Sequence, residues 1–225
     1  MERCPLDNPD PGAAPAVVQA RRLARQILNG DRSSHDWEHT WRVYRLCCEL
    51  GPREGADMTV LLVAALLHDI GRRDQDASRG AVCHAERGAA LARELLSDMP
   101  LTDPQKANVA HCVRAHRFRR APHPETVEAR VLFDADKLDA IGAVGIARAY
   151  QFAGEVGARL HNAAPDLRQT RAYSREDTGY REYQVKLRHI KDRLLTDAGR
   201  RVAEERHRFM VRFFERFLEE VEGHL

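Results

Sequence analysis

Apolar side chains recur along this chain at the three- and four-residue spacing of helices that bury one face. Residues 14–28 and 197–222 show this spacing clearly. The second of these segments carries an apolar stripe, expected to pack in the core, of Val202, Phe209, Phe213, Phe217 and Leu218. No segment of any length alternates apolar and polar residues as a half-buried strand does, and no internal repeat occurs. The pattern predicts an all-α protein.

Glycine, proline and short polar residues divide the sequence into a series of expected helices. After a flexible tail at residues 1–13, helices are expected at 14–28, 35–50, 58–69, 81–97, 103–118, 126–140, 146–160, 180–195 and 197–222. Segments 71–80 and 161–178 are expected to form polar loops. Residues 14–225 are expected to form one helical domain.

Composition narrows the class of protein without indicating its chemistry. The chain has 225 residues, 43% hydrophobic and 31% charged, which is enough for a substantial core. Its 36 Lys and Arg nearly balance 34 Asp and Glu, so no nucleic acid polymer is expected as a partner. Five cysteines form no Cys-x-x-Cys motif, which favours free thiols in a reducing compartment. Without a signal sequence or an apolar run of ~18 residues, we expect a cytoplasmic protein with no membrane partner.

An apolar run at residues 60–67 ends in His68 and Asp69. Buried helices rarely end in an imidazole and a carboxylate unless both groups find partners, although a histidine there can also complement the helix dipole. His39 and Asp136, on two other expected helices, complete a set of two imidazoles and two carboxylates. Such a set suits Mn²⁺, Fe²⁺, Co²⁺, Ni²⁺ or Mg²⁺ better than structural zinc, and leaves coordination positions for water and a phosphate oxygen.

The order of these ligands resembles the signature of the HD-domain metal-dependent phosphohydrolases. The local strings Ser34-His-Asp-Trp-Glu-His39, Leu66-Leu-His-Asp-Ile-Gly71 and Asp134-Ala-Asp-Lys-Leu-Asp-Ala-Ile-Gly142 fit as well. The likeness extends over about residues 15–220 and is to the small stand-alone bacterial hydrolases of this superfamily. It implies a helical bundle with a metal site at its centre, holding one divalent ion per chain, with Mn²⁺ as first choice. The implied metal ligands are His39, His68, Asp69 and Asp136.

The resemblance also implies hydrolysis of a phosphoester or phosphoanhydride in a small nucleotide. This branch includes pyrophosphohydrolases that convert nucleoside triphosphates to monophosphates and pyrophosphate, and this activity is our first expectation. Three alternatives stay open: a nucleotide 5′-phosphomonoesterase, a dinuclear iron oxygenase on the same helices, and a catalytically silent nucleotide-binding module. The C-terminal helix can pack within one subunit or between the subunits of a homodimer.

Further residues are assigned to proton transfer and to substrate binding. Some relatives carry a glutamate three residues after the His-Asp pair, where this chain has Arg72. The supporting carboxylate is therefore expected to be Asp74 or, second, Asp139, acting beside Asp69. Phosphate binding is expected from Arg72, Arg73, Arg79, Lys137 and the cluster Arg117, Arg119 and Arg120, because guanidinium groups match phosphate oxygens.

Four other histidines, His35, His84, His111 and His116, are expected to line the pocket or contact substrate. The string Cys83-His-Ala-Glu-Arg-Gly-Ala89 resembles one that carries a ligand for a second metal ion in some HD proteins. A second ion on His84 and either His116 or His111 is therefore an alternative, and it is the arrangement that the oxygenase requires.

Overall fold

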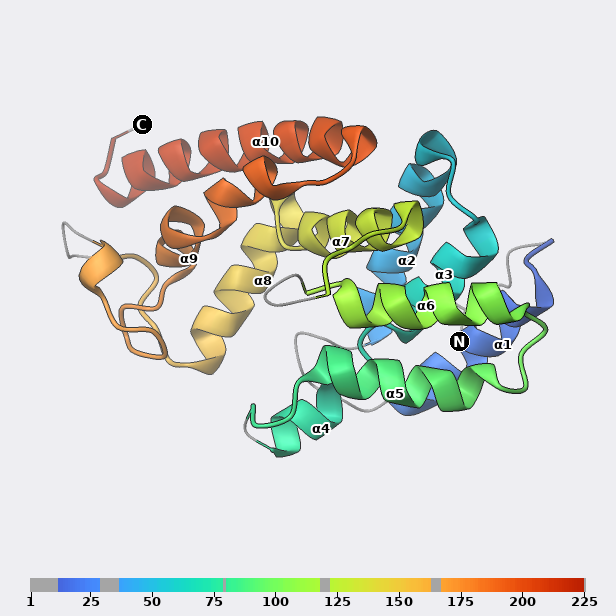
Figure 1. Ribbon diagram of the computed structural model, residues 1–225. Helices are drawn as coiled ribbons and strands as arrows, with labels where there is room; N and C mark the ends of the chain where they lie inside the picture. The colour runs from blue at the N-terminus through green and yellow to red at the C-terminus, as the bar shows by residue number, and fades with distance from the viewer. Residues whose placement is uncertain (1–11, 29–36, 79, 118–121, 163–166, 225) are drawn as a thin grey trace, which may run out of the picture. The chain divides into compact units, whose positions relative to one another are not determined.

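The computed structural model describes residues 12–28, 37–78, 80–117, 122–162 and 167–224. Within these ranges all regular structure is helical and no strand occurs, which confirms the all-α class (Figure 1). The chain divides into two compact units, Met1–Asp136 and Lys137–Leu225. The single domain expected over residues 14–225 stays a prediction.

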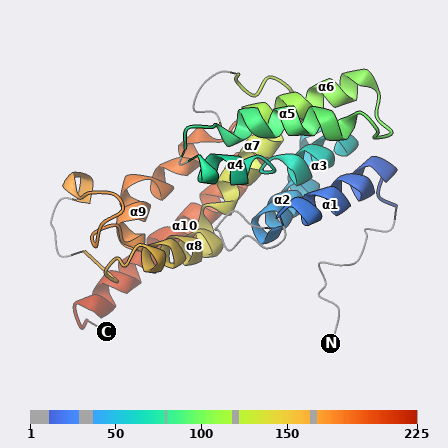
Figure 2. The ribbon, with the colours of Figure 1, turned by 90° about the horizontal axis from the view of Figure 1, so that it is seen from below.

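The first unit surrounds a helix that is apolar on almost every side. Its helices are α1 (Pro15–Leu28), α2 (Trp37–Glu54), α3 (Met58–Leu67), α4 (Arg72–Ala77), α5 (His84–Leu96), α6 (Asp103–Ala115) and most of α7 (Val127–Asp139). Helix α3 packs against α1, α2 and α6 (Figure 2). Its residues from Ala64 to Leu67 are fully buried. Because α3 ends in the core, the residues that follow it, His68 and Asp69, are also buried.

A buried carboxylate ties α7 to the helices beside it. Glu128, only 8% exposed, accepts hydrogen bonds from the backbone N–H of Asp57 at 2.7 Å and from Nδ2 of Asn108 at 2.9 Å. Asp57 in turn caps α3, and its Oδ1 accepts from the backbone N–H of Thr59 at 2.9 Å. These bonds fix the start of α3 and the middle of α6 against the start of α7.

Replacing Glu128 with leucine is expected to lower the free energy of unfolding by about 2 kcal/mol, because two donors lose their acceptor while the side-chain volume is roughly kept. Chemical denaturation of the two proteins measures this difference. The matched control is Glu94→Leu, an exposed position on α5 where a change within about 0.5 kcal/mol is expected. Equal effects of the two variants would show that the Glu128 bonds contribute nothing to stability.

The second unit contains the end of α7 and the helices that follow it. These are α8 (Gly142–Glu155), the 3-10 helices η2 (Leu167–Gln169) and η3 (Leu187–Arg193), α9 (Gly179–Val185) and α10 (Asp197–Val221). Phe214 of α10 is 2% exposed and stacks on Tyr183 with ring centroids 4.3 Å apart. The buried stripe of α10 is Ala203, Met210 and Phe214, whereas Phe209, expected in the core, is 41% exposed. The apolar stripe predicted from the sequence therefore lies on a face of α10 next to the one that is buried.

Several helix boundaries differ from those expected. Helix α2 continues through Pro52 to Glu54, and ends where Gly55 adopts a φ of +72° and the N–H of Ala56 bonds to the carbonyl of Gly51 at 3.1 Å. The expected loop 71–80 contains the short helix α4, and the expected helix 180–195 is α9 followed by η3. Helix α8 occupies 142–155 in place of 146–160.

In the described part of the chain, no helix combines the length and apolar character of a membrane span.

Candidate metal centre

Three residues from distant parts of the sequence converge in the first unit. His39 of α2, His68 at the end of α3 and Asp136 of α7 place their ligand atoms within 4.8 Å of one another. Nε2 of His39 lies 3.4 Å from Oδ1 of Asp136 and 3.3 Å from Nε2 of His68. Both histidines are fully buried. The structure thus brings together three of the four ligands expected from the sequence.

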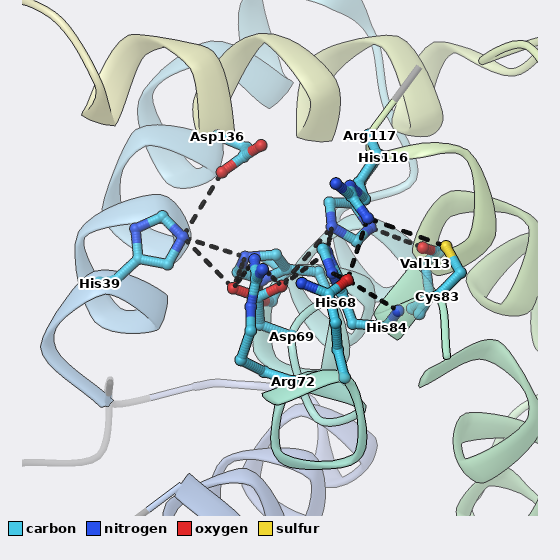
Figure 3. Close-up of polar contacts among 12 residues, drawn as sticks. His39, His68, Asp69, Arg72, Cys83, His84, Val113, His116, Arg117 and Asp136 are labelled. Carbon is cyan, nitrogen blue, oxygen red and sulfur yellow. Dashed lines mark hydrogen bonds and ion pairs between the residues drawn. The ribbon is translucent and has the colours of Figure 1, made fainter. Parts of the chain in front are cut away.

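The fourth expected ligand, Asp69, lies between this group and a second one (Figure 3). Its Oδ2 is 3.7 Å from Nε2 of both His39 and His68. Its Oδ1 is 3.3 Å from Nε2 of His84 and 3.6 Å from Nε2 of His116. Asp69, His84 and His116 form a second group whose ligand atoms also lie within 4.8 Å of one another. The two oxygens of one buried carboxylate therefore face two separate sets of imidazoles.

A close approach of two backbone segments creates the second group. Gly71 follows the His68-Asp69 pair, and a Cβ atom at this position would lie 2.4 Å from the carbonyl oxygen of His84 and 2.6 Å from the backbone nitrogen of Gly88. Only glycine allows this contact without a shift of the backbone. As a result the first residue of α5, His84, lies directly beside Asp69.

Backbone carbonyls orient two of the imidazoles. Nδ1 of His68 donates to the carbonyl of Ala65 at 2.8 Å, and Nδ1 of His116 donates to the carbonyl of Val113 at 2.6 Å. Since a carbonyl oxygen only accepts, Nδ1 carries a proton in each ring, and the neutral form of the ring then has its lone pair on Nε2. Imidazoles that bind metals are commonly oriented by such a bond from the opposite ring nitrogen.

The electrostatics of the cluster fit a bound cation. Burial lowers the pKa of His68 to about 4 and that of His84 to about 2, so both rings are neutral at pH 7. The Nε2 lone pair of His68 faces His39, and that of His116 lies 3.1 Å from Nε2 of His84. A cation among these nitrogens and the two carboxylates satisfies the lone pairs and offsets the buried negative charge. The nitrogen and oxygen donor set fits a divalent metal ion.

Arg72 also belongs to this centre. Its Nη2 lies 3.2 Å and 3.3 Å from the two oxygens of Asp69, and its side chain is 13% exposed. A guanidinium therefore contacts the shared carboxylate at the sequence position where some relatives carry an acid. Arg73, the next residue of α4, is exposed.

The other expected site residues lie elsewhere or outside the described residues. Nε2 of His111 accepts the backbone N–H of Glu125 at 3.1 Å, and His111 belongs to neither ligand group. Asp74 is 46% exposed and pairs with Arg87 at 2.5 Å. In the second unit, Asp139 is buried and pairs with Arg148 at 2.5 Å. Lys137 is partly exposed in that unit. The predictions for His35, Arg79, Arg119 and Arg120 fall outside the described residues.

One contributor to the centre was missed from the sequence. Oε1 of Gln75, on α4, contacts Nδ1 of His84 at 2.9 Å and Nη1 of Arg117 at 3.1 Å. A single glutamine in an expected loop gives no signal of such a role. To predict this role, one would first have to recognise α4 as a helix. Its six residues are all polar except Ala77, so the segment shows no apolar face.

Comparison with known proteins agrees with the geometry. The HD domain model matches residues 36–141. The uncharacterized protein YpgQ of Bacillus subtilis is 35% identical over 213 residues, which cover 91% of this chain and 93% of YpgQ. The crystal structure of YpgQ in complex with ADP superposes with a TM-score of 0.71 at 31% identity, over 91% of this chain and 94% of that one. An HD-superfamily hydrolase from Bacillus thuringiensis gives a TM-score of 0.72 at 28% identity, over 92% and 96% of the two chains. With these His and Asp residues gathered in an all-helical chain, this protein belongs to the HD-domain phosphohydrolase superfamily.

Proposed function

We propose that this protein is a metal-dependent nucleotide phosphohydrolase that cleaves a nucleoside triphosphate to the monophosphate and pyrophosphate. The observation that carries this proposal is the buried cluster of imidazoles and carboxylates around Asp69. A nucleotide substrate is supported by the YpgQ structure, which contains ADP. Guanidinium groups beside the cluster, above all that of Arg72, suit the binding of phosphoryl oxygens.

The centre is proposed to hold divalent ions, with Mn²⁺ as first choice. His39, His68, Asp69 and Asp136 would hold one ion, as expected from the sequence. The geometry further supports a second ion on Asp69, His84 and His116, in place of the single ion per chain expected from the resemblance. Such ions supply Lewis acid chemistry, since they polarise phosphoryl oxygens and acidify water near neutral pH.

The side chains of this protein would orient the reacting groups and carry protons. Asp69 would link the two ligand groups, because Oδ2 faces the first group and Oδ1 faces the second. Arg72 contacts the same carboxylate and would stabilise negative charge on a phosphoryl group. Asp74 stays the first candidate for proton transfer, although in this structure it pairs with Arg87.

A panel of nucleotides and phosphomonoesters, assayed with Mn²⁺, Co²⁺, Ni²⁺ and Mg²⁺, tests the proposed activity. We expect turnover of nucleoside triphosphates with pyrophosphate as the released product. Release of inorganic phosphate from monophosphates would identify a 5′-phosphomonoesterase instead. Metal-dependent nucleotide binding without turnover across the panel would identify a catalytically silent binding module.

A dinuclear iron oxygenase is a second candidate, and the second ligand group favours it specifically. Two sets of imidazoles that share a carboxylate, as seen around Asp69, suit a pair of iron ions as well as a pair of hydrolytic ions. Metal analysis of the purified protein, together with oxygen uptake, separates the two functions. Two irons with oxygen-dependent turnover would exclude the hydrolase, and anaerobic pyrophosphate release with Mn²⁺ would exclude the oxygenase.

Location and assembly stay predictions. A cytoplasmic location accords with the free thiols of Cys47, Cys48, Cys83 and Cys112 in the described part of the chain. The homodimer is to be tested by the mass of the protein in solution.

A further inference from the structure

We propose that Gln75 is a positioning residue that fixes the tautomer of His84, and so makes the second ligand group able to bind a metal ion. This inference rests on the proposed function, in particular on the second ion held by Asp69, His84 and His116. Gln75 lies on α4, between the His68-Asp69 turn and α5. Its Oε1 contacts Nδ1 of His84, and its effect on the ligand group would pass through that ring.

The orientation of the Gln75 amide follows from two of its neighbours. Its Oε1 lies 3.1 Å from Nη1 of Arg117 and 3.4 Å from the backbone nitrogen of His84. An arginine guanidinium and a backbone N–H are donors only. The amide atom that faces both must therefore be the oxygen, because the NH₂ group would place donor against donor.

The tautomer of His84 follows from the amide orientation. Its Nδ1 lies 2.9 Å from the same oxygen, which can only accept, so Nδ1 must carry the proton. Nε2 then carries a lone pair, directed toward Nε2 of His116 at 3.1 Å and Oδ1 of Asp69 at 3.3 Å. Since the carbonyl of Val113 fixes His116 in the same tautomer, two lone pairs and a carboxylate oxygen converge. Three acceptors at these distances form a site for a cation.

Loss of the Gln75 oxygen would open a competing arrangement. The His84 proton could move to Nε2, where Oδ1 of Asp69 is close enough to accept it. In that tautomer His84 donates a hydrogen bond to Asp69, and its lone pair lies on Nδ1, away from Asp69 and His116, where it cannot reach an ion in the second group. Gln75 therefore selects between His84 as a metal ligand and His84 as a hydrogen-bond donor.

The test reads the His84 tautomer by ¹⁵N NMR in the metal-free protein, with a His84→Asn variant to assign the ring signals. The wild type is expected to show the Nδ1–H tautomer. Gln75→Leu, which has no acceptor, is expected to shift the population to Nε2–H. Gln75→Glu keeps an acceptor in place and is expected to restore Nδ1–H. The matched control is Asp76→Leu at an exposed position on the same helix, which is expected to leave the tautomer unchanged.

Metal titration of the same variants with Mn²⁺ supplies the second readout. Gln75→Leu is expected to weaken binding of the second ion by about 10- to 100-fold, with the first ion bound as in wild type. Gln75→Glu is expected to bind both ions. An unchanged tautomer in Gln75→Leu, or a shifted tautomer with unchanged affinity for the second ion, overturns the proposal. Because the tautomer is read without metal or substrate, this failure is distinct from a failure to find nucleotide hydrolysis.

Discussion

Asp69→Ala is expected to lose both bound metal ions and to lower nucleotide turnover by roughly a thousand-fold or more, which corresponds to about 4 kcal/mol of transition-state stabilisation. The reason is the position of its carboxylate, with Oδ2 facing His39 and His68 and Oδ1 facing His84 and His116. Asp69 belongs to the second ligand group, and its Oδ2 also lies 3.7 Å from the two imidazoles of the first. Metal analysis after dialysis and an assay of pyrophosphate release measure the two losses.

Two controls separate this effect from unfolding. Asp69→Asn keeps the side-chain volume and a neutral oxygen, so the fold is expected to survive while metal affinity falls. Asp76→Ala removes an exposed carboxylate nearby on α4 and is expected to match wild type in both measurements. Circular dichroism reports whether each variant keeps its helices. Full metal occupancy in folded Asp69→Ala would refute the assignment of Asp69 as a shared ligand.

His116→Ala is expected to reduce the metal content from two ions per chain to one. Nε2 of His116 lies 3.1 Å from that of His84 and 3.6 Å from Oδ1 of Asp69, whereas the first group consists of His39, His68 and Asp136. Removing one of three protein ligands weakens the second site, and the first keeps all of its own. Metal analysis of the purified variant, loaded with Mn²⁺ and then desalted, gives the stoichiometry.

The chain offers a matched control for this experiment on the same helix. His111→Ala removes an imidazole that contacts the backbone of Glu125 and belongs to neither ligand group, so the wild-type metal content is expected. If His116→Ala keeps both ions, the second group is not a metal site. If it loses both, the two groups do not act as separate sites.

The helical class and the first ligand group could be predicted from the sequence. His39, His68 and Asp136 could be identified because an imidazole or a carboxylate on an otherwise apolar helix is costly to bury without a partner. The strength of the signal came from the ordered set of four residues, with Asp69 as the fourth, and from its resemblance to the HD-domain signature. The structure places all three side chains together, which periodicity alone could not establish.

The second ligand group could not be derived in the same way. Whether His84 and His116 meet depends on how α5 and α6 approach the turn after α3, and the contact at Gly71 that permits this approach involves backbone atoms only. The relation of Asp69 to both groups depends on the orientation of one carboxylate. The role of Gln75 could not be predicted from the sequence either, because its partners His84 and Arg117 are 9 and 42 residues away along the chain.

Errors in the helix boundaries have local causes. Helix α4 is too short and too polar to show an apolar face, so its segment was predicted as a loop. The buried stripe of α10 was misplaced because apolar residues occur on more than one face of that helix. Packing decides which face is buried, and the sequence of an isolated helix does not record it.

Anomalous diffraction at the manganese edge, from crystals grown with Mn²⁺, tests the central claim most directly. We expect one peak among His39, His68, Asp69 and Asp136, and a second among Asp69, His84 and His116, with the Asp69 carboxylate between them. A single peak at the first group would reduce the centre to one ion and remove the basis for a role of His116 in metal binding. The absence of a peak at the first group would contradict the metal-dependent mechanism.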